Sequence, residues 1–248
     1  MLVTGIKSKP VYAPLQADTR GRYHLMLGMG VGAAPLLRVI ADLRSAAEQA
    51  LKNTRVLFVP DAGNGAAGAG RVGAAIQPTG AAIQPTSAAI APTGAATQPA
   101  GAAIGPTGAA PGIEQFKAAA VGDVRAFAGT PALLEHFRTT LRQSQMGTRL
   151  YVAGPESFIG LVMKIALEFN LNKDEIRAEE CGSLARRVYC IHCRATTESV
   201  RTNIVQCIGC RRWLLVRDHY SRRLAAYMGV MADAEAPGEL PQLVEVFL

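Results

Sequence analysis

The chain has 248 residues, with 26 Lys and Arg against 19 Asp and Glu, and 49% of its residues are apolar. This length suits one large or two small globular domains. The chain contains no run of about 18 apolar residues that could cross a bilayer, and its opening MLVTGIKSKPVY lacks the apolar core of a secretion signal. The sequence therefore predicts a cytoplasmic protein without a membrane partner. Its net charge of +7 favours an acidic partner, a cofactor phosphate or nucleic acid.

Short apolar runs alternate with amphipathic stretches along most of the chain, as in an α/β protein. The expected elements, in chain order, are a strand over 23–27 ending in the turn GMGVG, a helix over 34–51, a strand over 55–60, a short helix over 113–121, a strand over 123–129, a helix over 131–145 with Thr130 as its N-cap, a strand over 148–154, a helix opened by Pro155, and a strand over 174–181. This order predicts a parallel, doubly wound sheet formed by residues 1–60 and 113–181.

Residues 61–112 interrupt this pattern as a low-complexity insert. They hold 18 Ala, 11 Gly and 6 Pro, and their only charged residues are Asp61 and Arg71. From Gly73 the sequence repeats every seven residues for five units, and each unit carries a Pro, which would cost about 3 kcal/mol inside a helix. A coiled coil is therefore excluded, and the scarcity of large apolar side chains predicts a disordered, linker-like segment.

Doubly wound sheets bind ligands at the carboxyl ends of their strands, and two Gly-containing turns are expected there. Glycine lets backbone amides approach a pyrophosphate, which the positive end of the following helix favours. The candidate cofactor-binding residues are Gly28, Gly30, Gly32 and Pro35 in the first turn and Gly154 and Pro155 in the second. The simpler alternative is that both are tight turns without a ligand.

The segments GVGAAPLLRVI and LYVAGPESFIGLVMKIALEFNLNKDEIRAEE resemble the pyridine-nucleotide subdomain of the ferredoxin reductase superfamily, with its GxGxxP turn near the start and its YxCGP-type turn near the end. The resemblance implies a site for NAD(P)H. Two polar positions of that pattern differ here, because Ala34 replaces the usual Thr and Ala153 the usual Cys. The flavin-binding barrel that precedes this subdomain in the superfamily has no counterpart, so we expect no catalytic residues here and no hydride transfer by this chain alone.

Four of the five Cys lie in two CxxC pairs, Cys190 with Cys193 and Cys207 with Cys210. In a reducing compartment such pairs hold metal more often than they form disulfides. Thirteen residues separate the two pairs, so four thiolates can converge on one tetrahedral ion. The spacing predicts a four-Cys zinc ribbon within residues 182–248.

Iron is the alternative to zinc, because a rubredoxin-like site uses the same four sulfur ligands and would transfer electrons. Rubredoxins usually have Gly directly after the second Cys of each pair, whereas Arg194 and Arg211 stand there in this chain. We therefore expect zinc.

Basic and aromatic residues follow the second pair, in the stretch RRWLLVRDHYSRRLAAYMGV. The simplest interpretation is a strand over WLLVRD, a short amphipathic helix and solvent-exposed arginines. Alternatives are a surface for an acidic protein or cofactor propionates, or a nucleic-acid site. The acidic residues Asp233, Glu235 and Glu239 interrupt the basic stretch and disfavour nucleic acid.

The whole stretch VYCIHCRATTESVRTNIVQCIGCRRWLLVRDHYSRRLAAYMGVMADAEAPGELP closely resembles the C-terminal module of the DmmA family, a subunit of bacterial dimethylamine monooxygenase. The preceding reductase-like part fits the N-terminal region of that family. The resemblance implies a multisubunit enzyme that converts dimethylamine, O₂ and NAD(P)H to methylamine and formaldehyde. Haem-containing and flavin/iron-sulfur reductase subunits would be the partners of this chain.

The resemblance implies an accessory, structural or electron-transfer role, because the chain has neither a flavin barrel nor the Cys spacing of a plant-type [2Fe-2S] cluster. Two other functions stay open. One is an NAD(P)H-binding reductase component, and the other is a nucleic-acid-binding zinc-ribbon protein.

Overall fold

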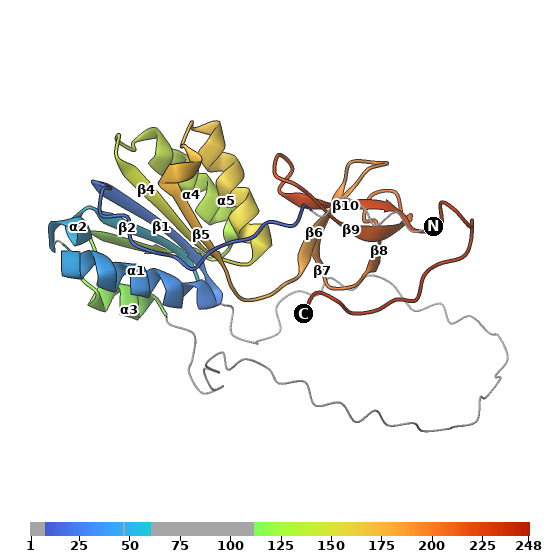
Figure 1. Ribbon diagram of the computed structural model, residues 1–248, viewed down its shortest axis with the longest axis horizontal. Helices are drawn as coiled ribbons and strands as arrows, with labels where there is room; N and C mark the ends of the chain where they lie inside the picture. The colour runs from blue at the N-terminus through green and yellow to red at the C-terminus, as the bar shows by residue number, and fades with distance from the viewer. Residues whose placement is uncertain (1–7, 47, 61–111) are drawn as a thin grey trace, which may run out of the picture. The chain divides into compact units, whose positions relative to one another are not determined.

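The computed structural model describes residues 8–46, 48–60 and 112–248 (Figure 1). The predicted disorder of the insert, residues 61–112, concerns residues that lie outside this description, apart from Gly112. Within the described part of the chain, no helix is long and apolar enough to cross a membrane.

The first sheet is parallel throughout and has the strand order β3-β2-β1-β4-β5. Its strands are β1 (Tyr23–Met29), β2 (Thr54–Val59), β3 (Asp123–Ala126), β4 (Thr148–Gly154) and β5 (Ile176–Glu180). The chain moves outward from β1 to β3 and then crosses to β4 on the other side. This order confirms the doubly wound α/β fold.

Helices cover both faces of the parallel sheet (Figure 1). The helices are α1 (Ala33–Ala46), α2 (Glu48–Lys52), α3 (Ile113–Ala118), α4 (Thr130–Arg142) and α5 (Glu156–Glu168). Successive residues of β1 serve opposite faces: Met26 packs with the α1 and α3 side, whereas Leu25 and Leu27 pack with α4 and α5. Burial on both faces explains why the three central strands, β1, β2 and β4, read as mainly apolar runs.

Two helix starts differ from the prediction by one residue. Gly129, in an extended conformation, is the N-cap of α4, and Thr130 already belongs to the helix. Thr130 therefore does not cap α4, and its hydroxyl faces the sulfur of Met29 at 3.9 Å instead. Pro155 is the N-cap of α5 rather than its first residue. Proline fits the first turn of a helix as well as the residue before it, so its presence does not fix the starting position.

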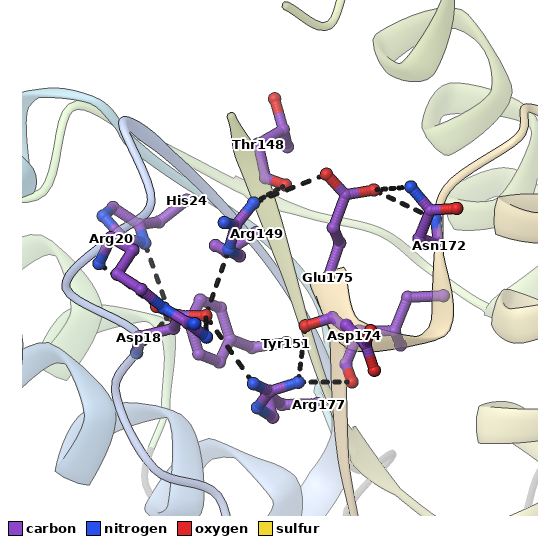
Figure 2. A network of polar contacts seen from close by, with 11 residues as sticks. Asp18, Arg20, His24, Thr148, Arg149, Tyr151, Asn172, Asp174, Glu175 and Arg177 are labelled. Carbon is purple, nitrogen blue, oxygen red and sulfur yellow. Dashed lines mark hydrogen bonds and ion pairs between the residues drawn. The ribbon is translucent and has the colours of Figure 1, made fainter. Parts of the chain in front are cut away.

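A network of charged groups around Asp18 fixes the segment before β1 to the amino ends of β4 and β5 (Figure 2). The side chain of Asp18 is only 5% exposed. It accepts hydrogen bonds from Arg20 at 2.9 Å and from Arg149 at 3.1 Å, and the guanidinium of Arg177 lies 3.6 Å away. The hydrogen bond from Arg20 is the main reason that the pKa of Asp18 lies well below its usual range. The backbone N–H of Asp18 also donates to the hydroxyl of Tyr151 at 2.9 Å.

The second sheet has the strand order β7-β6-β10-β9-β8. Its strands are β6 (Arg186–Cys190), β7 (Thr196–Val200), β8 (Ile204–Gln206), β9 (Trp213–Ser221) and β10 (Ala226–Met231). Strand β10 lies in the centre, parallel to β6 and antiparallel to β9. The strand predicted over WLLVRD is thus part of β9.

The short amphipathic helix predicted after WLLVRD is wrong, because β9 continues to Ser221, a turn follows over 222–225, and β10 begins at Ala226. Ala226 and Tyr227 of β10 are buried, and the guanidinium of Arg186 lies between the rings of Tyr227 and Phe247, 4.0 and 3.8 Å from their centroids. Pairing on both edges and burial in the middle of a sheet outweigh the helical preference of this Ala- and Arg-containing stretch.

Candidate functional site

The four predicted metal ligands converge at one end of the second sheet. Cys190 ends β6 and Cys207 directly follows β8, so each strand carries one CxxC turn, which we call a knuckle. The sulfur atoms of Cys190 and Cys210 lie 3.7 Å apart and those of Cys193 and Cys207 lie 3.5 Å apart, and all four sulfurs lie within 4.8 Å of one another. Four sulfurs bound tetrahedrally at about 2.3 Å from one ion would be about 3.8 Å apart. The donor set therefore fits one tetrahedral metal ion.

The two knuckles have the same backbone hydrogen bonds. The N–H of Arg194 donates to the carbonyl of Cys190 at 2.9 Å, and the N–H of Arg211 donates to that of Cys207 at 3.0 Å. The N–H groups of Cys190 and Cys207 donate in turn to the carbonyls of Ala195 and Arg212, each at 2.9 Å. These hydrogen bonds close both turns and position the four sulfurs without any disulfide bond.

The environments of the four thiols differ. Cys190 and Cys207 are buried, whereas Cys193 is exposed. Burial raises the pKa of the Cys190 thiol to about 11, and the backbone N–H of Arg212 lowers the pKa of Cys210 to about 6. Only thiolates bind metal, so metal binding at this cluster would release protons, including the proton of Cys190.

The fifth cysteine does not belong to the cluster. Cys181 directly follows β5, is half-buried, and donates its backbone N–H to the carbonyl of Gly154 at 2.9 Å. Burial raises the pKa of its thiol to about 11, so it is a poor nucleophile near neutral pH.

The fold brings both predicted glycine turns together at the carboxyl edge of the parallel sheet. Gly30 to Gly32 form a short 3₁₀ turn between β1 and α1, and Gly30 has a φ of 54°, which favours glycine. A Cβ at Gly32 would overlap the carbonyl oxygen of Ala153, and a Cβ at Gly154 would lie 3.3 Å from the Cβ of Met29. The first turn therefore packs directly against the end of β4.

Two of the predicted cofactor-binding residues also have packing roles. A Cβ at Gly28 would lie 2.7 Å from a methyl group of Leu36 and 3.0 Å from the ring of Phe58, so glycine at this position lets α1 approach the sheet. Pro35 is buried in the first turn of α1. Both observations fit the alternative of tight turns without a ligand.

Two buried acidic residues have no counterpart among the predicted site residues. Asp18 is described above, and Glu156 is the first residue of α5, directly after the turn with Gly154 and Pro155. The side chain of Glu156 is buried, which raises its pKa to about 7. An acidic residue opening an otherwise apolar helix is a signal that could have identified it. Asp18 lies in a segment without periodicity, so no pattern points to it.

Family profiles match most of the chain. The profile described as dimethylamine monooxygenase subunit DmmA-like, N-terminal domain, matches residues 4–99 and 103–176. The profile of the C-terminal domain of the same family matches residues 187–230, which include all four cysteines of the cluster.

One curated relative is the heme-dependent oxidative N-demethylase delta subunit of Ectopseudomonas mendocina (strain ymp). It is 36% identical over 99 residues, which make up 40% of this chain and 57% of the relative. The match therefore spans little more than half the length of that protein.

Two of the solved structures that the chain matches are reductases. Phthalate dioxygenase reductase has a TM-score of 0.38 and 14% identity, covering 78% of this chain and 46% of that one. The cytochrome P450 reductase GcoB of Amycolatopsis has a TM-score of 0.36 and 12% identity, and the match covers 66% of this chain and 38% of GcoB. Similarity at this level carries no information on activity.

Proposed function

Because the chain belongs to the dimethylamine monooxygenase subunit DmmA-like family, we propose that it is an accessory or electron-transfer subunit of a multisubunit secondary-amine monooxygenase. The reaction of the assembled enzyme would convert dimethylamine, O₂ and NAD(P)H to methylamine and formaldehyde. The partners would be a haem-containing subunit and a flavin/iron-sulfur reductase subunit. The proposal rests on the match of both parts of the chain, in the right order, to the two domains of this one family.

The four cysteine sulfurs are the proposed metal ligands: Cys190, Cys193, Cys207 and Cys210. Their separations support a single tetrahedral ion. We propose zinc with a structural role, because the small apolar core of the second sheet needs an additional constraint. Iron at the same sulfurs would instead supply one-electron transfer.

The decisive experiment is assembly with the haem-containing subunit of the enzyme from the same organism. The two chains are purified separately, mixed, and analysed by size-exclusion chromatography and by dimethylamine-dependent NAD(P)H oxidation with the reductase subunit added. We expect a stable complex and activity that requires this chain. Full activity without the chain, or absence of any complex with either partner, would contradict the proposed role.

Metal analysis of the purified chain distinguishes bound zinc from bound iron. We expect about one zinc per chain and a colourless protein. A red protein with one iron per chain and a reversible redox couple would replace the structural role with electron transfer.

A second candidate function, binding of NAD(P)H, is suggested by the position of both glycine turns at the carboxyl edge of the parallel sheet, each directly before a helix. Pyrophosphates bind at this edge of doubly wound sheets. The proposed ligands are the backbone groups of Gly28, Gly30, Gly32, Pro35, Gly154 and Pro155. Calorimetric titration with NADPH and NADH tests this function, and dissociation constants in the millimolar range would remove it.

A further inference from the structure

The residue after the first cysteine of each knuckle is an exposed isoleucine. Ile191 is 46% exposed and Ile208 is 65% exposed, although each directly follows a buried cysteine. A Cβ at Gly209 would lie 2.9 Å from the sulfur of Cys193 and 2.8 Å from the Cβ of Ala195, so the second knuckle packs tightly against the first. The two knuckles therefore lie directly against each other, and we define the knuckle face by their exposed apolar and basic residues, Ile191, Arg194, Ile208, Arg211 and Arg212.

Two arginines of the knuckle face have a backbone conformation that disfavours any side chain. Arg194 has a φ of 67° and Arg211 a φ of 63°, both in the left-handed region. Glycine adopts this region without the steric conflict that a Cβ introduces. An arginine at both equivalent positions keeps a guanidinium on this face at a cost in backbone strain, and such strain often accompanies a functional site.

Acidic residues of the described part of the chain do not neutralise the positive charge of the knuckle face. Arg194, Arg211 and Arg212 are exposed, and no carboxylate in the described part of the chain lies within ion-pair distance of their guanidinium groups. The acidic residues of the neighbouring strands are engaged elsewhere. Glu198 pairs with Arg187 at 2.9 Å and Asp218 with Arg186 at 2.7 Å.

We infer that the knuckle face is a docking surface for an acidic patch on a protein partner. Apolar residues flanked by arginines match the composition of energetically important interface positions, since Arg is enriched there and buried apolar contacts exclude water. Three unpaired guanidinium groups would steer an acidic surface toward the apolar tips. The inference deepens the proposed function, on which it rests, by assigning the contact with the haem-containing subunit to these residues.

Replacing both strained arginines by glycine provides a test that separates folding from docking. In the variant with Arg194→Gly and Arg211→Gly, backbone strain is relieved, so we expect an unchanged or higher Tm and an unchanged metal content. Loss of two interface arginines should raise the Kd for the purified haem-containing subunit by about tenfold at low salt. The affinity of the variant should also depend less on salt between 50 and 200 mM, as measured by calorimetry, because fewer charges attract the partner.

Two matched controls accompany this variant. Asn170→Gly with Ser199→Gly relieves strain at two other exposed positions, whose φ values are 59° and 55°, and should leave Kd unchanged. Arg217→Ala with Arg223→Ala removes two exposed positive charges, one from β9 and one from the turn after it, and should change Kd less than twofold. Ile208→Ser should weaken binding without changing its salt dependence, because it removes only an apolar contact.

The outcomes distinguish the inference from the proposed function. If the wild-type chain binds the haem-containing subunit and the glycine variant binds it equally well, the knuckle face is not the docking surface, although the subunit role stands. If the wild-type chain does not bind this subunit, the subunit role and the inference both fail. Binding of a random-sequence DNA duplex that is tighter than binding of the subunit, and is lost in the glycine variant, would overturn the inference in favour of nucleic acid.

Discussion

The parallel sheet and the second sheet of this chain achieve stability in different ways. Fifteen buried residues form the apolar cluster on one face of the parallel sheet and thirteen form the cluster on the other. The second sheet has one cluster of nine buried residues, two of which are the cysteines Cys190 and Cys207. Small cores rarely stabilise a fold alone, so the proposed metal site would supply a constraint that the small core of the second sheet lacks. The stability of the two sheets should therefore respond differently to metal removal, to packing changes and to pH.

The largest expected difference follows loss of the metal ligands. Replacing Cys207 and Cys210 by Ser should unfold the second sheet, because structural metal sites contribute roughly 10 kcal/mol or more to folding. Hydrogen exchange should show loss of protection over residues 186–231 and retained protection over 23–59 and 123–180. Cys181→Ser is the matched control and should leave both regions protected. Equal protection in the double variant would show that the core of the second sheet is sufficient.

A packing change should destabilise the parallel sheet and spare the cysteine cluster. In Gly32→Ala the new methyl group would overlap the carbonyl oxygen of Ala153, so α1 or β4 has to shift. We expect a loss of about 3 kcal/mol in the free energy of unfolding, measured with urea, and an unchanged metal content. Gly112→Ala, where an added Cβ meets no atom within 4 Å, should be near neutral. An unchanged free energy of unfolding in Gly32→Ala would mean that the turn can move away from the Ala153 carbonyl at little cost.

The Asp18 network should make the parallel sheet sensitive to acid. Its hydrogen bond from Arg20 and the nearby Arg149 hold the pKa of Asp18 below its ordinary value, so its contribution to stability is present above about pH 4 and is lost as the pH falls further. Asp18→Asn should cost about 2 kcal/mol at pH 7, because it removes the buried carboxylate that Arg20, Arg149 and Arg177 share, and with it their charge-assisted hydrogen bonds. The difference from wild type should shrink toward pH 3 in thermal unfolding. A constant difference would contradict the electrostatic explanation.

The smallest expected effect concerns Glu156, whose contribution to stability depends on pH in the opposite direction to that of Asp18. Its pKa is raised from 4.5 to about 7, so the folded state holds the proton more tightly and stability falls as the pH rises through this window. Glu156→Gln should therefore increase stability by about 1 kcal/mol at pH 8 and have little effect at pH 4, because the cost of burying an amide offsets part of the gain. Glu135→Gln, at an exposed position of α4, is the control. Destabilisation at pH 8 would mean that the charged form of Glu156 has a favourable partner.

The parallel sheet could be predicted because local signals and tertiary structure agree there. The run TRLYVAG predicts a strand over 148–154, and β4 has these bounds because both of its faces are buried. The meeting of the two glycine turns also follows from the sequence, since the carboxyl ends of adjacent parallel strands lie at one edge of the sheet. Likewise, the CxxC spacing predicts the convergence of four sulfurs.

Features that depend on distant partners could not be predicted. Strands β1, β2 and β3 lie between Asp18 and Arg149 in the sequence, and only the fold brings these two side chains within 3.1 Å of each other. The stretch of β10 has residues compatible with a helix, and its pairing with both β6 and β9 decides its conformation. The left-handed backbone of Arg194 is equally hidden, because arginine gives no signal for a positive φ.

The parallel pairing of β10 with β6 is a long-range contact in the sequence. It closes a loop that contains both knuckles and β9, and such non-local pairing is intrinsically slow. A metal ion that joins Cys190 to Cys210 would close most of that loop before β10 arrives. Refolding of the second sheet should therefore accelerate with free metal concentration until knuckle assembly is no longer rate-limiting, whereas refolding of the parallel sheet should not respond.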